Sequence, residues 1–105
     1  MVDRRVAAVF ALDVVGYSRR MADDEIRTLE SLHDLKNSVL YPAFERWHGR
    51  VFKEMGDGFL AEFASVVEAV ECAHEIQENA ANLVEQHGAD ALKQRIGFHF
   101  GEDLS

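Results

Sequence analysis

The sequence predicts an α+β domain in which a largely antiparallel sheet carries helices on one face. Three features of its 105 residues support this prediction: a continuous apolar run that ends at Asp13, a long stretch with helical periodicity, and two apolar segments that meet at Gly56-Asp57-Gly58. The last pattern is typical of a tight β-hairpin, because glycines supply the positive φ of the turn and an aspartate tolerates it.

The first expected strand runs from Arg5 to Asp13. Every residue between these two charged ends is apolar, which is the pattern of a central strand buried on both faces. Residues 14–18 then predict a turn and a helix N-cap. Backbone amides of Gly16, Tyr17 and Ser18 could therefore point at an anion such as a phosphate.

A long amphipathic helix is expected from residue 23 or 24 to about residue 48. Its apolar residues recur at three- and four-residue steps, which places them on one face of a helix. Pro42 lacks a backbone N–H, so we expect it to kink or interrupt the helix near Leu40 and Tyr41. Gly49 is expected to end the helix.

The rest of the chain predicts a hairpin, a helix and one more strand. The hairpin arms are residues 50–55 and 59–63, and Leu92 to Gly101 forms the last strand. Between them, Ser65-Val-Val-Glu68 is a capping box that opens a helix to about Gln86. The residues expected on the core face of this helix are Val66, Val70, Ala73, Ile76 or Gln77, Ala80 and Val84. The order β-α-β-β-α-β is that of a ferredoxin-like, palm-type sheet.

Composition limits the classes of function. The 19 acidic and 11 basic side chains give a formal charge of −8, which argues against nonspecific binding to nucleic acid. Cys72 is the only cysteine, so an internal disulfide is excluded and a reducing, cytoplasmic location is expected. The sequence has no run of ~18 apolar residues, so we expect no membrane contact from this segment.

Asp13, Lys53 and Asp57 are charged residues that could carry chemistry. The strands that bear the two aspartates can be neighbours, which would bring both carboxylates to one edge of the sheet. Mg²⁺ usually takes one or two carboxylates and completes its coordination with water and substrate phosphates. Alternatively, Asp57 is only a hairpin residue and Asp13 only a capping residue, while Lys53 is an edge or surface lysine. Spacing alone leaves both interpretations open.

Four collinear motifs run along nearly the whole chain. They are Ala8 to Ser18, Gly49 to Phe59, Phe63 to Val70, and Arg95 to Glu102. Together they resemble the class III adenylate/guanylate cyclase catalytic domain of bacterial type. The resemblance implies a reaction in which the ribose 3′-oxygen of ATP attacks the α-phosphorus, giving cyclic AMP and pyrophosphate.

The resemblance also implies a metal site. Asp13 and Asp57 match the two metal-binding aspartates of the family, each expected to contact both of two Mg²⁺ or Mn²⁺ ions, and the Val14 carbonyl matches a further ligand. One ion would lower the pKa of the 3′-hydroxyl, while the other would neutralise charge on the triphosphate.

Substrate contacts follow in the same way. Gly16, Tyr17 and Ser18 match the loop that holds the triphosphate through backbone amides, and Lys53 matches a base-selecting residue of adenylate rather than guanylate cyclases. In the family the sites form at a head-to-tail dimer interface, so a homodimer or a cyclase-like partner chain is implied. Asp57 and Lys53 of one chain would then serve two different sites.

The sequence ends at Ser105, before the positions at which the family carries a second base-selecting residue and a transition-state Asn and Arg. We therefore expect residues 1–105 to form one incomplete catalytic domain with little or no activity alone. The alternative is a noncatalytic, degenerate cyclase-like module that binds nucleotide or a partner chain. A diguanylate-cyclase-like or polymerase-palm domain would share two metal carboxylates, but the turn at Gly56-Asp57-Gly58 lacks a following acidic pair.

Overall fold

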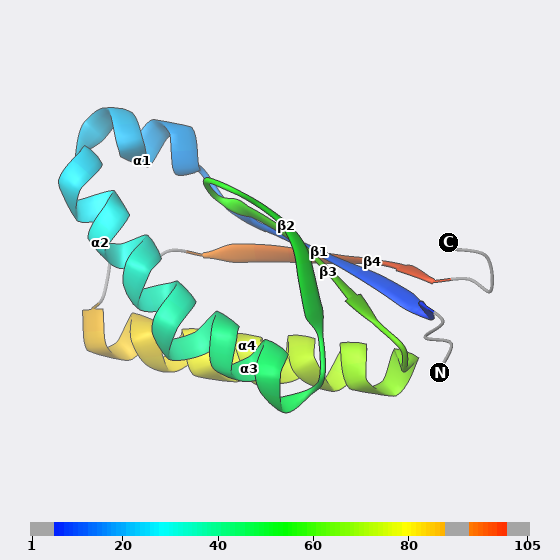
Figure 1. Ribbon diagram of the computed structural model, residues 1–105. Coiled ribbons are helices and arrows are strands. Elements are labelled where there is room, and N and C mark those ends of the chain that lie inside the picture. The colour runs from blue at the N-terminus through cyan, green and yellow to red at the C-terminus, as the bar shows by residue number, and fades with distance from the viewer. Residues whose placement is uncertain (1–5, 88–92, 101–105) are drawn as a thin grey trace.

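The computed structural model describes residues 6–87 and 93–100, which form one antiparallel sheet with helices on one of its faces (Figure 1). The sheet has the order β2-β3-β1-β4, so β1 lies between β3 and β4. The strands are β1 (Ala8–Val14), β2 (Arg50–Met55), β3 (Gly58–Phe63) and β4 (Gln94–Phe100). This arrangement confirms the predicted α+β fold. Three ends of expected strands, at Arg5, Leu92 and Gly101, lie outside the described residues.

The helical part of the chain is more divided than its sequence pattern predicts. It consists of α1 (Tyr17–Asp23), α2 (Glu25–Leu35), the π-helical segment η1 (Lys36–Leu40), α3 (Tyr41–Arg46) and, after the hairpin, α4 (Val66–His87). The start predicted at residue 23 or 24 is the start of α2, where the Asp24 carboxylate accepts the Arg27 amide at 3.1 Å. Before it lies the short helix α1, whose N-cap Gly16 falls within the predicted turn and N-cap at residues 14–18, although the sequence predicted no helix over residues 17–23.

The interruption predicted at Pro42 is the segment η1. The Tyr41 amide donates to the Lys36 carbonyl, five residues back, which is the hydrogen bond that defines a π-helix. Pro42 then lies in the first turn of α3, where its missing N–H removes no intrahelical hydrogen bond. The proline is thus accommodated at a new helix start, after one widened turn.

A Schellman motif ends α3. His48 adopts the left-handed conformation with a φ of 62°, the Gly49 amide donates to the Phe44 carbonyl at 2.8 Å, and the His48 amide donates to the Glu45 carbonyl at 3.4 Å. Gly49, the expected stop, lies instead against Phe63, since an added Cβ would lie 2.5 Å from the ring. Packing rather than φ therefore requires this glycine.

The hydrophobic core lies between the sheet and the helices. In β1 the buried residues alternate, so the prediction that this strand is buried on both faces was wrong: Ala11 on the other face is exposed. Phe10 stands at the centre of the core, with ring centroids 5.4 Å from Phe44, 5.5 Å from Phe98 and 5.9 Å from Phe63. The second face of β1 is open because none of the helices within residues 6–87 and 93–100 covers it.

The core face of α4 is only partly the predicted one: Ala73, Ile76 and Ala80 are buried as expected, but the three valines are not. Val66, Val70 and Val84 are 42%, 47% and 42% exposed, respectively. The residues that do pack against the core are mostly small: Ala69, Cys72, Ala73, Ile76 and Ala80. Small side chains let the helix approach the sheet closely, whereas ranking by hydrophobicity favours the valines.

The start of α4 bears out one half of the predicted capping box. The Ser65 hydroxyl accepts the Glu68 amide at 3.2 Å, as expected. The Glu68 carboxylate does not complete the box, because its Oε2 pairs with His48 Nδ1 at 2.6 Å. This pair links the end of α3 to the first turn of α4.

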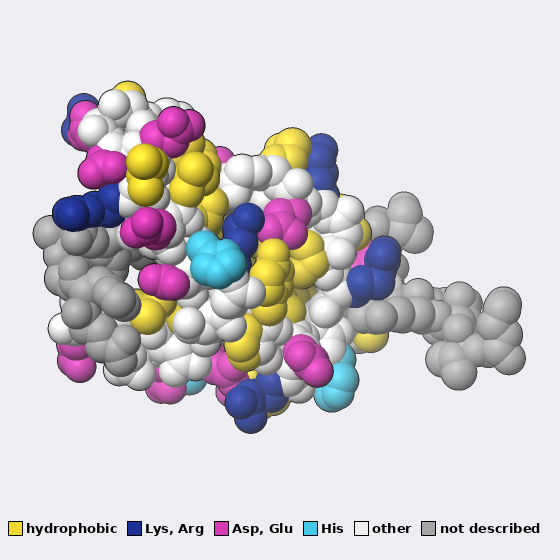
Figure 2. Space-filling model, turned by 60° about the vertical axis from the view of Figure 1, so that its left-hand side comes forward, with side chains coloured by type: hydrophobic (Ala, Val, Ile, Leu, Met, Phe, Trp, Pro, Cys, Tyr) yellow, Lys and Arg dark blue, Asp and Glu magenta, His cyan; other side chains and the backbone are white. Residues whose placement is uncertain are grey.

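Figure 2 shows acidic side chains spread over one face of the molecule, with hydrophobic side chains between them. The Lys and Arg side chains of the described residues on this face are separated from one another, so they form no continuous positive surface there. Among residues 6–87 and 93–100, the longest helix is too polar to cross a lipid bilayer, and none of the others qualifies as a membrane span.

Candidate functional site

A cleft of about 470 Å³ opens on the sheet face that the helices leave uncovered. Its lining comes from all four strands, and the charged side chains in it are Asp13 of β1, Lys53 of β2 and Arg95 of β4. Apolar residues such as Ala11, Met55 and Leu60 make up much of the remaining wall. The structure therefore brings two of the three charged residues singled out in the sequence to one depression.

Asp13 lies between Gly58 of β3 and Arg95 of β4, which are its cross-strand neighbours. Both carboxylate oxygens accept hydrogen bonds from the guanidinium: Arg95 Nε lies 3.0 Å from Oδ1, and Nη2 lies 3.1 Å from Oδ2. These bonds and the charge of Asp13 raise the pKa of Arg95. A metal ion that binds Asp13 must therefore displace or share this contact.

Sequence analysis did not assign Arg95 to the site. The signal that could have indicated it is a charged residue within a predicted strand, where its side chain must face either solvent or a partner. The partner itself is 82 residues away in the sequence. Only strand pairing brings the two together.

Asp57 lies in the two-residue turn between β2 and β3. Gly56 has a φ of 48° while Gly58 already belongs to β3, so only the first glycine supplies the positive φ, as in a type II′ turn. The Val14 amide donates to the Asp57 carbonyl at 3.1 Å, which ties the turn to the end of β1. Asp13 and Asp57 consequently lie at the same edge of the sheet, as the sequence predicted.

Residues 16–18 form the entry to α1. Gly16 is the N-cap, with a φ of 68°, and its carbonyl accepts the Arg20 amide at 3.0 Å. The amides of the first helical turn, including those of Tyr17 and Ser18, have no intrahelical acceptor. A Cβ added to Gly56 would lie 3.8 Å from the Tyr17 ring, so this loop lies beside the hairpin turn that carries Asp57.

Two carboxylates at one edge fit a divalent cation that takes its remaining ligands from water and from a bound phosphate. Within residues 6–87 and 93–100, no group of three His, Cys, Asp or Glu side chains is close enough to hold a metal ion by itself. The donor set therefore suits Mg²⁺ or Mn²⁺ delivered together with a phosphate ligand better than a structural metal.

Lys53 faces the same open side from the edge strand β2. It is exposed, and its ammonium group forms no hydrogen bond or ion pair with any residue that the structure describes. A lysine without an internal partner on the wall of a cleft is available to a ligand. It is equally compatible with the surface lysine that the alternative interpretation assumes.

Comparison with known proteins places these residues in a family, although no protein-family model matches the chain. The chain is 43% identical over 102 residues to "Putative adenylate cyclase 3" of Rhizobium meliloti (strain 1021). This alignment covers 96% of this chain and 17% of that protein. It is 33% identical to the adenylate/guanylate cyclase/hydrolase from Silicibacter pomeroyi, whose crystal structure it matches with a TM-score of 0.81.

That structural match covers 94% of this chain and 58% of the Silicibacter chain. The adenylyl cyclase CyaB from P. aeruginosa shares the fold at 19% identity, with a TM-score of 0.77 over 94% of this chain and 57% of its own. The chain thus spans a little over half of each solved structure and about a sixth of the curated relative. By sequence and by fold, it belongs to the class III adenylate/guanylate cyclase catalytic domains.

Proposed function

We propose that this chain is part of an adenylate cyclase active site that converts ATP to cyclic AMP and pyrophosphate. One observation carries the proposal: strand pairing and the hydrogen bond from the Val14 amide to the Asp57 carbonyl bring the turn with Asp57 to the end of β1 that bears Asp13, beside the uncovered face of the sheet. The 43% identity to an adenylate cyclase homologue supports the choice of reaction.

In this proposal Asp13 and Asp57 hold two Mg²⁺ or Mn²⁺ ions, with the Val14 carbonyl as a further ligand. When bound, such ions lower the pKa of the ribose 3′-hydroxyl and neutralise charge on the triphosphate. The amides of Gly16, Tyr17 and Ser18 bind phosphate oxygens, in keeping with their position at a helix start. Lys53 contacts the adenine base of the nucleotide whose metal ions are held by the other chain of the dimer, and its charge orients that nucleotide.

The uncovered sheet face is also where a second chain would complete the site. Its wall contains exposed apolar residues, among them Met55, which is 61% exposed. A homodimer or a cyclase-like partner chain that covers this face would exclude water and bring a base-contacting residue to the metal site of the other chain. Accordingly, the 105-residue chain alone is expected to have little or no cyclase activity.

The test is binding of Mn²⁺ and ATP to the chain. Asp13→Asn and Asp57→Asn should each weaken Mn²⁺-dependent ATP binding by about tenfold or more, because each removes one hard-oxygen ligand. The control is Asp34→Asn, which removes an exposed carboxylate on α2 and should bind as the wild type does. Unchanged affinity in both site variants would remove the metal assignment.

A second candidate function has one observation in its favour. Arg95 donates a hydrogen bond to each carboxylate oxygen of Asp13, which is what we expect if Asp13 has a structural role and binds no metal. On that reading the chain is a noncatalytic cyclase-like module that binds nucleotide or a partner chain. It predicts ATP binding that does not depend on Mn²⁺ and does not change in Asp13→Asn, so the same titration distinguishes the two.

A further inference from the structure

A β-bulge decides which way Lys53 points. Strand β2 pairs with β3 as Val51 with Ala61 and then as Lys53 with Leu60, so Phe52 is an extra residue without a partner. Ala61 is buried on the helix side and Leu60 lies in the cleft wall. Since paired residues share a face, the bulge turns Lys53 into the cleft, whereas strict alternation would turn it with Val51 toward the helices.

The same bulge turns Glu54 toward the helices. Glu54 is paired with Phe59, whose ring is buried in the core at 1% exposure. An acidic side chain on this side of the sheet needs a partner, because its charge loses water there. The strand also needs support, because β2 is an edge strand with β3 as its one neighbour in the sheet.

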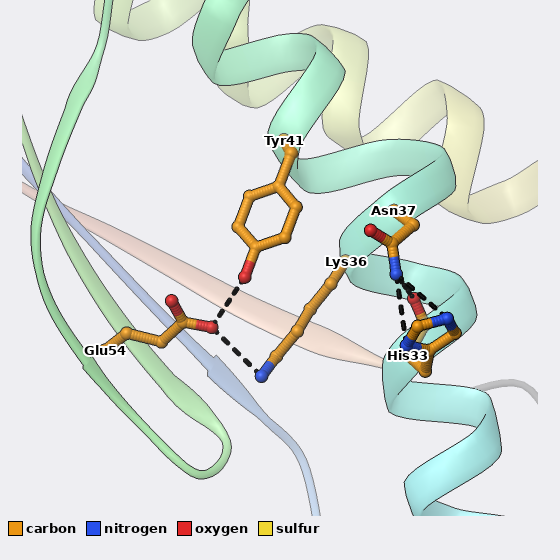
Figure 3. Close-up of polar contacts among 5 residues, drawn as sticks. All are labelled: His33, Lys36, Asn37, Tyr41 and Glu54. Carbon is orange, nitrogen blue, oxygen red and sulfur yellow. Dashed lines mark hydrogen bonds and ion pairs between the residues drawn. The ribbon is translucent and has the colours of Figure 1, made fainter.

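Two residues of the helical layer meet Glu54 (Figure 3). Tyr41 Oη donates to Glu54 Oε1 at 2.8 Å, and Lys36 Nζ lies 3.0 Å from the same oxygen. The Lys36 ammonium also lies 5.4 Å from the centre of the Phe59 ring, a cation–π contact. Lys36, Tyr41, Glu54 and Phe59, which we term the Glu54 cluster, thus join the hairpin to the helices next to Lys53.

The segment η1 is what brings Lys36 and Tyr41 together. Residues five apart in an α-helix point about 140° away from each other, so they cannot meet one carboxylate. The hydrogen bond from the Tyr41 amide to the Lys36 carbonyl widens this turn, and both side chains then reach Glu54 Oε1. Where α2 passes into η1, the Asn37 side-chain amide donates to the His33 carbonyl at 2.9 Å (Figure 3).

We propose that Glu54 is a positioning residue for Lys53: the Glu54 cluster fixes the bulged register of β2 and so holds the lysine in the cleft. This inference rests on the proposed role of Lys53 as the base contact. Loosening the cluster would let β2 slip or twist, and the lysine would meet the base in fewer molecules. Binding and choice of base should therefore suffer more than the chemical step.

The experiment uses a polypeptide that contains the whole catalytic domain, with kcat and KM measured for ATP and GTP. Glu54→Gln should raise KM for ATP and lower the preference for ATP over GTP by about 3- to 10-fold, with kcat changed less than about twofold. Tyr41→Phe, which keeps the ring and removes one hydrogen bond, should shift both quantities in the same direction by a smaller factor. If Glu54→Gln fails to fold, Tyr41→Phe alone still tests the inference.

The matched control is Glu62→Gln. Glu62 of β3 pairs with Arg50 of β2 at 2.6 Å, so this variant breaks an ion pair of the same hairpin at the end away from Lys53. It should leave the preference for ATP unchanged. An equal loss of preference in Glu62→Gln would mean that general loosening of the hairpin, not the Glu54 cluster, is responsible, and would overturn the inference.

Lys53→Ala separates the two proposals. If it changes the preference for ATP while Glu54→Gln and Tyr41→Phe do not, the positioning role is wrong and the base contact stands. If Lys53→Ala leaves the preference unchanged, the base contact is wrong, and the positioning role falls with it. A loss of preference in Lys53→Ala and Glu54→Gln, but not in Glu62→Gln, supports both.

Discussion

Arg95 holds both carboxylate oxygens of Asp13, at 3.0 and 3.1 Å, across the pair of strands β1 and β4. The pair is well exposed, with 73% of the Arg95 side chain and 45% of the Asp13 side chain accessible to water. Ion pairs as exposed as this one contribute little to stability, so a divalent cation can displace the guanidinium at small cost. Arg95 thus neutralises and orients the Asp13 carboxylate, the proposed metal ligand, until a divalent cation binds it.

The first prediction concerns this pair. Arg95→Gln should increase the affinity of the nucleotide-free chain for Mn²⁺ by about two- to fivefold, because the ion no longer competes with the guanidinium. Isothermal titration or the electron spin resonance signal of free Mn²⁺ measures the change. The control is Arg46→Gln, which breaks the pair of Arg46 with Glu75 on the helices. If Arg95→Gln bound Mn²⁺ no more tightly than the wild type, competition between Arg95 and the ion for Asp13 would be contradicted.

The second prediction concerns the close approach of Gly49 to Phe63. In Gly49→Ala the new Cβ would lie 2.5 Å from one ring carbon and 2.8 Å from another. Phe63 is buried at 1% exposure and packs against Phe10, so moving its ring disturbs the core and the free energy of unfolding should fall by about 1–3 kcal/mol. Urea denaturation of the chain measures it.

Gly97→Ala is the matched control, since nothing lies within 4 Å of an added Cβ there. Its free energy of unfolding should stay close to that of the wild type. If the two alanine variants were equally stable, the tight contact between Gly49 and the Phe63 ring would be wrong.

The third prediction is a pH window for the Glu54 cluster. Burial opposes ionisation of Glu54, but hydrogen bonds from Lys36 and Tyr41 and the charge of Lys36 outweigh it and lower the pKa of Glu54 below its ordinary 4.5. Stability from this group is therefore complete above pH 4.5 and is lost as the pH falls through the lowered pKa.

At the alkaline end the sign is reversed. Burial and the hydrogen bond and charge of Glu54 raise the pKa of Tyr41 above its ordinary 10.0, so its contribution is complete below pH 10 and is lost above the raised pKa. The urea midpoint of the wild type should approach that of Glu54→Gln in acid and that of Tyr41→Phe in alkali. If the urea midpoints of the wild type and the two variants differed by the same amount at every pH, the hydrogen bonds of the Glu54 cluster would be contradicted.

The sequence predicted features that depend on neighbouring residues. The two arms of the hairpin, the Ser65 N-cap and the interruption at Pro42 all follow from local backbone chemistry, and the structure has them where expected. Placing Asp13 and Asp57 at one edge needed only the inference that β1 and β3 are neighbours.

What sequence analysis missed depends on contacts between distant segments. The partner of Asp13 is fixed by the register of β1 against β4, and the face of Lys53 by a bulge at Phe52 that no alternation of residue types indicates. In α4 the valines outrank the alanines in hydrophobicity, yet Val66, Val70 and Val84 are exposed while Ala69, Cys72 and Ala73 are buried. Tertiary packing and strand pairing, rather than the secondary-structure propensity or hydrophobicity of single residues, determine the partner of Asp13, the face of Lys53 and the core face of α4.

The fourth prediction uses Cys72, which lies in the face of α4 that packs against the core and is 0% exposed. Burial, with a smaller effect from the charge of Glu75, raises the pKa of its thiol to about 12. Because the thiolate is the reactive form, labelling by a thiol reagent at pH 8 should be at least about 100-fold slower in the native chain than in urea. The control is Val67→Cys in a Cys72→Ala background, since Val67 on the same helix is 69% exposed and should react at nearly the unfolded rate. Equally fast labelling of Cys72 in native chain and in urea would mean that α4 does not pack through this face.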